Sequence, residues 1–207
     1  MFKKSARKIQ LRMLSYIHQE LSVKAIRDNS SMVRLNIGSG NTTIPGFINI
    51  DARNLPNVHI VSDKLTLDDF KDGSVSEIYL CHVLEHVSHL NITSVLSHYY
   101  EKLCSGGLLR LSVPDFREIV RIYEGGGGDI SLIETALMGG QDYDYNFHKS
   151  LYDETYLTDK LLLAGFHDIK NWATDEDFGG SIGDWSDLKI RGSGKRYRIS
   201  LNLKACK

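Results

Sequence analysis

Cysteine, proline and long apolar runs are all scarce in this chain. Its three cysteines, Cys81, Cys104 and Cys206, are widely spaced and form no Cys-x-x-Cys pair. Such a set argues against both a disulfide framework and a zinc ribbon, so we expect a reducing, cytoplasmic location. No run is long and apolar enough for a signal peptide or a transmembrane helix, so we expect neither export nor membrane insertion.

An excess of charge of one sign is also missing. Lys and Arg number 25 against 26 Asp and Glu, so no overall field attracts the chain to nucleic acid, and we expect no nucleic-acid partner. Residues 1–30 have the pattern of an amphipathic helix with a basic first third, which would extend the main domain. The two alternatives for its basic residues are plain solvation and peripheral contact with anionic lipid.

Length and pattern together predict a single α/β domain over residues 31–207. Apolar runs of strand length lie at 32–37, 47–50, 58–61, 75–80 and 108–113. Helical patterns lie at 92–103, 116–123, 130–138 and 154–163. This alternation is typical of a parallel sheet with helical crossovers.

Two late strands depart from the alternation, because no helix is expected between 166–172 and 196–205. They predict an antiparallel edge hairpin, with the Asp- and Gly-rich segment 173–194 as a long loop. The expected fold is therefore a doubly wound, seven-stranded, mostly parallel sheet with helices on both faces, preceded by an N-terminal helix.

The strongest local signal is an apolar strand that runs directly into Gly38-Ser39-Gly40, followed by a second strand that ends at Asp51. Glycines at such a turn let the backbone approach a ligand closely, and the acid can accept hydrogen bonds from ribose hydroxyls. A plain tight turn is the alternative. The spacer 41–46 is too short for a helix whose N-terminus could hold a pyrophosphate, which argues against a dinucleotide.

Six ordered motifs between residues 32 and 170 resemble the class I methyltransferases that depend on S-adenosylmethionine (SAM). They are LNIGSG at 35–40, PGFINID at 45–51, DGSVSEIY at 72–79, HVLEH at 82–86, GGLLRLSVPD at 106–115 and AGF at 164–166. Within that class it resembles a compact group often associated with surface-polysaccharide genes. The resemblance implies a Rossmann-like sheet, SAM as cofactor and S-adenosylhomocysteine (SAH) as product.

The same resemblance implies a cofactor site at the carboxyl ends of the first strands. The two glycines would line the methionine part of SAM, and Asp51 would bind the ribose. Asn36 stands where the family usually has an acid. The full expected set, with Asp63 or Leu65 beside adenine and Cys81 and His82 facing the sulfonium, is Asn36, Gly38, Ser39, Gly40, Asp51, Asp63, Leu65, Cys81 and His82.

A polar segment over 139–149 resembles the group's Gly-Gly-Gln and later histidine. Because loops beyond the carboxyl ends of the strands cover the ligand in such folds, we expect 139–152 to form a lid over a small-molecule or glycan acceptor. The expected acceptor-binding residues are Gln141, Tyr143, Tyr145 and His148. For the tyrosines the alternative is a small core of the loop itself. The sequence determines neither the acceptor nor the oligomeric state.

Methyl transfer to a hydroxyl requires an aligned acceptor and a base for its proton. His148 is the first candidate base, and His82 and Asp115 are the second choices. The alternative for His148 is packing or hydrogen bonding within an ordered loop. The alternative to an enzyme is a module that binds SAM or SAH without catalysis, which the missing acid at Asn36 favours.

The HVLEH motif also matches H-x-x-E-H, the inverted zinc-protease motif. It directly follows an apolar strand, so we expect His82 to end that strand and not to share a helical face with His86. Glu85 and His86 would then cap and cover the next helix. A zinc-dependent hydrolase is a further alternative, but we expect no metal.

Overall fold

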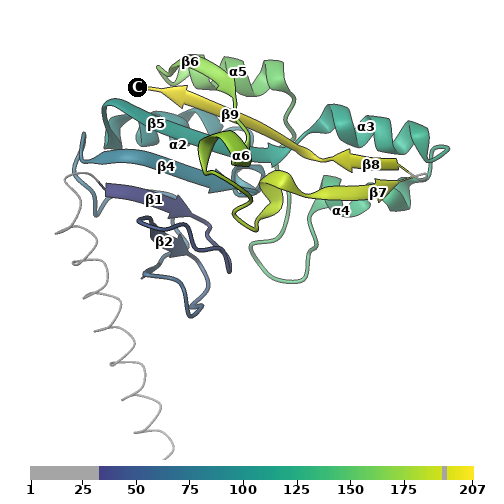
Figure 1. Ribbon diagram of the computed structural model, residues 1–207, viewed down its shortest axis with the longest axis horizontal. Helices are drawn as coiled ribbons and strands as arrows, with labels where there is room; N and C mark the ends of the chain where they lie inside the picture. The colour runs from purple at the N-terminus through teal and green to yellow at the C-terminus, as the bar shows by residue number, and fades with distance from the viewer. Residues whose placement is uncertain (1–32, 193–194) are drawn as a thin grey trace, which may run out of the picture.

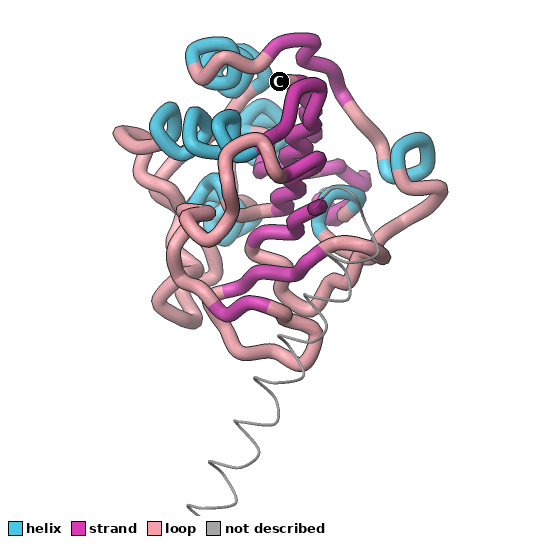
Figure 2. Tube along the Cα trace, turned by 90° about the vertical axis from the view of Figure 1, so that its left-hand side faces the viewer, coloured by secondary structure: helices cyan, strands magenta, loops and turns pink. Residues whose placement is uncertain are grey.

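The computed structural model describes residues 33–192 and 195–207, and a seven-stranded sheet runs through the middle of the molecule (Figures 1 and 2). Its strand order is β3-β2-β1-β4-β5-β9-β6. The strands are β1 (Val33–Ile37), β2 (Ile48–Asp51), β3 (Ile60–Val61), β4 (Val75–Cys81), β5 (Leu103–Pro114), β6 (His167–Asn171) and β9 (Ser200–Cys206). The first five pair in parallel, and β9 runs antiparallel between β5 and β6. The expected mostly parallel sheet with an antiparallel edge is confirmed.

The helices follow the expected order along the chain. They are α2 (Ile92–Lys102), α3 (Phe116–Gly125), α4 (Glu134–Met138), α5 (Glu154–Leu163) and α6 (Thr174–Asp177), with the 3-10 turns η1 (Leu84–His86), η2 (Ile130–Leu132) and η3 (Trp185–Asp187). No helix in the described part of the chain is long and apolar enough to cross a membrane. The helix expected over 1–30 lies outside the described residues.

The expected last strand is divided in two. β8 (Lys195–Arg198) pairs with β7 (Lys189–Gly192) in a separate hairpin, and β9 begins after Ile199. Ile199, between β8 and β9, is buried in a small cluster with Ile119, Ile122 and Ile133. This packing fixes the point at which the two strands separate. The expected long loop over 173–194 was therefore wrong in part, because it contains α6, η3 and β7, whose short lengths leave no periodicity in the sequence.

The two faces of the sheet are covered differently. On one face, α2 and α5 pack side by side over alternating strand residues, which include Ile78, Leu80, Leu109, Leu111 and Leu203. On the other face, the segment around α6 lies over β5 (Figure 1). There Trp172 and Phe178 meet the Tyr79 ring edge-on, with centroids 5.7 Å from it. Within the described residues this face is covered by irregular segments and the short helix α6, because the spacers after β1 and β2 contain no helix.

A charged network lies between this second face and its cover. Arg110 on β5 pairs with Glu77 on β4 and, at 3.1 Å, with Asp177 of α6. Lys204 on β9 donates to the same Asp177 oxygen at 2.6 Å. The Asp177 side chain is only 5% exposed, so two cations neutralise a buried carboxylate and anchor α6 to the sheet.

We predict that Asp177→Asn lowers the free energy of unfolding by about 2 kcal/mol at pH 7. Burial opposes ionisation, but the hydrogen bonds from Lys204 and Arg110 outweigh it and lower the pKa of Asp177 below its ordinary 3.8. A lowered pKa stabilises the fold above pH 3.8, and this contribution is lost as the pH falls through the folded pKa. Urea unfolding should therefore show the deficit shrinking below pH 3.8. Exposed Asp159→Asn is the control, and a deficit independent of pH would contradict the assignment.

Candidate functional site

The turn after β1 has the backbone conformation that only glycine adopts without strain. Gly38 and Gly40 have φ of 63° and 53°, and a Cβ at Gly38 would collide with the Val83 side chain. Ser39 N donates to Ile50 O at 3.1 Å, which holds the turn against the end of β2. The Ser39 hydroxyl is buried and has no hydrogen-bond partner among the described residues, so it is available to a ligand.

Asp51 ends β2 directly beside this turn and is 6% exposed. Its Oδ2 accepts from the Gly40 N–H at 2.7 Å. Its Oδ1 accepts from the backbone N–H of Arg53 at 2.9 Å and from Arg53 Nε at 3.1 Å. The residues expected around the ribose are thus brought together, with the Arg53 guanidinium against the carboxylate.

An amide network that sequence reasoning missed supports the same turn. Asn36 Nδ2 donates to Asn49 Oδ1 at 3.1 Å, and both side chains are buried. Asn49 in turn donates to the carbonyls of Thr42 and Asn57 at 3.1 and 2.9 Å, and Asn57 donates to those of Gly40 and Thr42. Asn36 is therefore engaged with the protein. The signal in the sequence is an asparagine two residues before both Gly38 and Asp51.

Two contacts join the 139–148 segment to residues expected at the cofactor. The Tyr145 hydroxyl lies 3.4 Å from Asp63 Oδ2. The Arg53 guanidinium, bonded to Asp51, lies over the Tyr143 ring at 5.0 Å. These tyrosines stay 46% and 37% exposed. The expected acceptor segment therefore lies beside the Asp51 edge of the sheet.

The end of this segment is fastened to η1. The Glu85 carbonyl accepts from the N–H groups of Lys149 and Ser150 at 2.7 and 3.1 Å. The Tyr152 hydroxyl donates to the Leu84 carbonyl at 3.0 Å, and His86 Nδ1 lies 3.1 Å from the Phe147 carbonyl. The chain beyond β4 thus fixes the segment that reaches Asp51.

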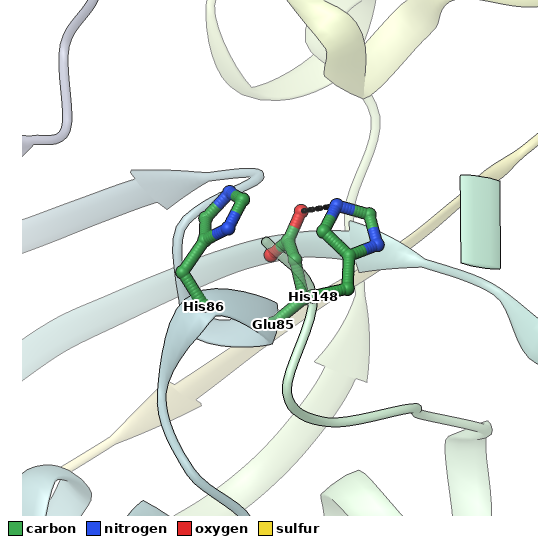
Figure 3. A group of neighbouring side chains, drawn as sticks. All are labelled: Glu85, His86 and His148. Carbon is green, nitrogen blue, oxygen red and sulfur yellow. Dashed lines mark ion pairs between the residues drawn. The ribbon is translucent and has the colours of Figure 1, made fainter. Parts of the chain in front are cut away.

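His148 lies against Glu85 and His86 (Figure 3). Its Nε2 is 4.0 Å from Glu85 Oε1, and its ring meets the His86 ring edge-on at 5.0 Å. Its Nδ1 is 3.1 Å from the Ala136 carbonyl and therefore donates to it. Burial lowers the pKa of His148 below its ordinary value, so the ring is neutral at pH 7 with a lone pair on Nε2.

Solved methyltransferases share this architecture. A SAM-dependent methyltransferase from Archaeoglobus fulgidus matches with TM-score 0.54 at 15% identity, over 91% of this chain and 94% of its own. A SAM-dependent methyltransferase from Thermotoga maritima matches with a TM-score of 0.51 at 16% sequence identity, over 100% of this chain and 98% of its own. The 1,6-didemethyltoxoflavin-N1-methyltransferase of Burkholderia thailandensis matches with a TM-score of 0.50 at 12% sequence identity, over 99% of this chain and 83% of its own. The chain has the class I methyltransferase fold. No protein-family model and no curated protein sequence matches it.

Within this methyltransferase fold, His82 turns away from the Asp51 edge. It has φ of 53°, its Nε2 is 2.8 Å from Ser200 Oγ, and its ring lies 5.7 Å from that of Trp185. Its Nδ1 is 3.3 Å from Glu85 Oε1. His82 follows the end of β4 and lies outside η1, so the H-x-x-E-H histidines share no helical face. Cys81 packs with the Tyr79 cluster, where burial raises the pKa of its thiol.

Three other expected residues have clear local roles in the methyltransferase fold. Asp115 caps α3, because its Oδ1 accepts from Arg117 N at 2.9 Å. Leu65 packs against the main core. Gln141 has φ of 53° and its N–H donates to Asn146 O at 2.9 Å within the segment.

An open hollow of about 560 Å³ between 181–189 and β8 is lined by none of the expected site residues.

We predict that Gly38→Ala lowers the free energy of unfolding by about 3 kcal/mol, because it adds a collision with Val83 to the strain of a positive φ. Gly73→Ala is the matched control: Gly73 has φ of 70° with open space around it, so its cost should be about 1 kcal/mol. Urea unfolding measures both. Equal costs would show that Val83 does not close the turn.

Proposed function

We propose that the chain is a SAM-dependent methyltransferase whose acceptor is a hydroxyl of a small molecule or glycan. The observation that carries the proposal is the Asp51 carboxylate, buried at the end of β2 and bonded to the Gly40 N–H. A carboxylate in this position can accept hydrogen bonds from two ribose hydroxyls. The Arg53 side chain, which contacts one oxygen, would give way to the ribose.

The residues around Asp51 fit an adenosyl ligand without phosphate. The buried Ser39 hydroxyl has no partner in the described part of the chain, so it can bond a polar group of the methionine end. Asp63 and the half-buried Leu65 follow β3 and can flank adenine. The Burkholderia structure of this fold holds SAH, which supports the same ligand class here.

SAM would supply a methyl group on a sulfonium, which passes to the acceptor oxygen as the carbon–sulfur bond breaks and SAH forms. The hydroxyl of the methyl acceptor must lose its proton to a base. We propose His148 Nε2 as that base, because Nδ1 donates to the Ala136 carbonyl. His82 and Asp115 are less suited, since each is bonded to its own neighbours.

The exposed part of the 139–148 segment supports a sugar-like acceptor. Tyr143 and Tyr145 are substantially exposed beside the proposed cofactor residues. Aromatic faces next to amide and carboxylate groups, here Gln141, Asp142 and Asp144, suit a ligand with an apolar ring face and several hydroxyls.

A module that binds SAM or SAH without catalysis is the second candidate. The observation in its favour is Asn36, which holds the place of the usual acid and is bonded to Asn49. Methyl transfer from labelled SAM to a panel of sugars and sugar nucleotides separates the two candidates. An enzyme produces SAH with an acceptor present, whereas a binding module does not.

We predict that calorimetric titration of the purified chain shows binding of SAM and SAH but not of NAD. Asp51→Ala should weaken SAM about 100-fold, because two hydrogen bonds to a charged group contribute about 1.5 kcal/mol each. Asp51→Asn keeps the side-chain shape and should weaken SAM as well. His148→Ala should bind SAM as the wild type does.

Thermal unfolding of each variant checks that it is folded. SAM affinity unchanged in a folded Asp51→Asn variant would contradict the role of Asp51. Binding of NAD in place of SAM would contradict the ligand class.

A further inference from the structure

A compact group of side chains that could bind a metal ion includes His148 of the proposed acceptor segment (Figure 3). Glu85, His86 and His148 each offer one ligand atom, and these atoms lie within 4.8 Å of one another. Two come from η1 and the third from a segment some sixty residues later. Tertiary structure, not local sequence, therefore brings the three together.

Glu85 is the buried member of this group. Its side chain is 1% exposed, and neither oxygen has a hydrogen-bond partner within residues 33–192 and 195–207. Its nearest polar contacts are histidine rings, His82 Nδ1 at 3.3 Å and His148 Nε2 at 4.0 Å from Oε1. Buried charges in proteins are normally paired, hydrogen-bonded or bound to metal.

Each of the two histidines in this group has one ring nitrogen held by a backbone carbonyl. His148 Nδ1 donates to the Ala136 carbonyl, which leaves Nε2, on the side of Glu85, as the ring nitrogen that can bind an ion. His86 Nδ1 is likewise held by the Phe147 carbonyl. A backbone carbonyl on the second ring nitrogen is the usual outer support of a metal-binding histidine, since it fixes both the tautomer and the ring orientation.

We propose that Glu85, His86 and His148 bind a divalent transition-metal ion. Two imidazoles and one carboxylate suit ions such as Zn²⁺ and Co²⁺, whereas Mg²⁺ prefers an all-oxygen shell. Three protein ligands leave a position open for a water or a hydroxyl. The H-x-x-E-H motif would make His82 the second histidine ligand, but His82 is bonded to Ser200. His148 is the second histidine ligand in the proposed site.

The role of the ion rests on the proposed function. At the open position it would bind the acceptor hydroxyl, lower the pKa of that hydroxyl and let its proton leave to solvent water. His148 Nε2 would then be a ligand and not the base. Metal binding itself requires neither SAM nor an acceptor, so it is tested without them.

The experiment is calorimetric titration of the chelator-stripped full chain with Zn²⁺, Co²⁺ and Mg²⁺. We expect one equivalent of Zn²⁺ or Co²⁺ to bind and Mg²⁺ to bind much more weakly. His86→Ala, His148→Ala and Glu85→Gln should each weaken Zn²⁺ at least about 100-fold, since even the outer partners of metal ligands contribute 10- to 100-fold.

His89→Ala is the matched control, because His89 is exposed and only three residues from His86. It should bind Zn²⁺ as the wild type does. Glu85→Gln keeps the backbone bonds to Lys149 and Ser150, and thermal unfolding shows that each variant is folded.

Absence of stoichiometric Zn²⁺ and Co²⁺ binding, equal binding of Mg²⁺, or affinities unchanged in all three ligand variants would overturn the site. His148 and Glu85 would then face each other without a metal ion. Failure of SAM binding with Zn²⁺ binding intact would overturn the proposed function alone.

Discussion

The hydrogen bonds between η1 and residues 147–152 are the constraint on which the site depends. The Glu85 carbonyl accepts two N–H groups of this later segment, and the Leu84 carbonyl accepts the Tyr152 hydroxyl. Fastened there, the preceding residues 139–146 must lie over the edge of the sheet, where Tyr143 meets Arg53. One short turn after β4 therefore positions both the histidine cluster and the proposed acceptor segment.

The unequal faces of the sheet follow from short connections. The helices α2 and α5 cover one face, whereas loops, α6 and a buried charge network cover the other. Without a helix directly after β1, the Gly38–Gly40 turn is held by side chains: Asp51 bonds Gly40, and the asparagine network bonds the carbonyls that follow. Polar side chains thus supply the rigidity that a helix would otherwise give.

Local features of the sequence predicted what depends on local interactions. The helix expected at 154–163 has the bounds of α5, and the acid expected at the end of the second strand lies beside the glycine turn. Features that depend on distant contacts were missed. The break at Ile199 depends on packing against α3, and the partner of Glu85 and His86 is His148, which spacing within HVLEH could not indicate.

The most direct test of the account is a crystal structure of the chain with SAH. We expect the ribose hydroxyls to bond to the Asp51 carboxylate and the Arg53 side chain to be displaced from it. The amino-acid end of SAH should lie at the Gly38–Gly40 turn, with a hydrogen bond to Ser39 Oγ. SAH bound at another place, or Asp51 still paired with Arg53 and making no contact with the ligand, would contradict it.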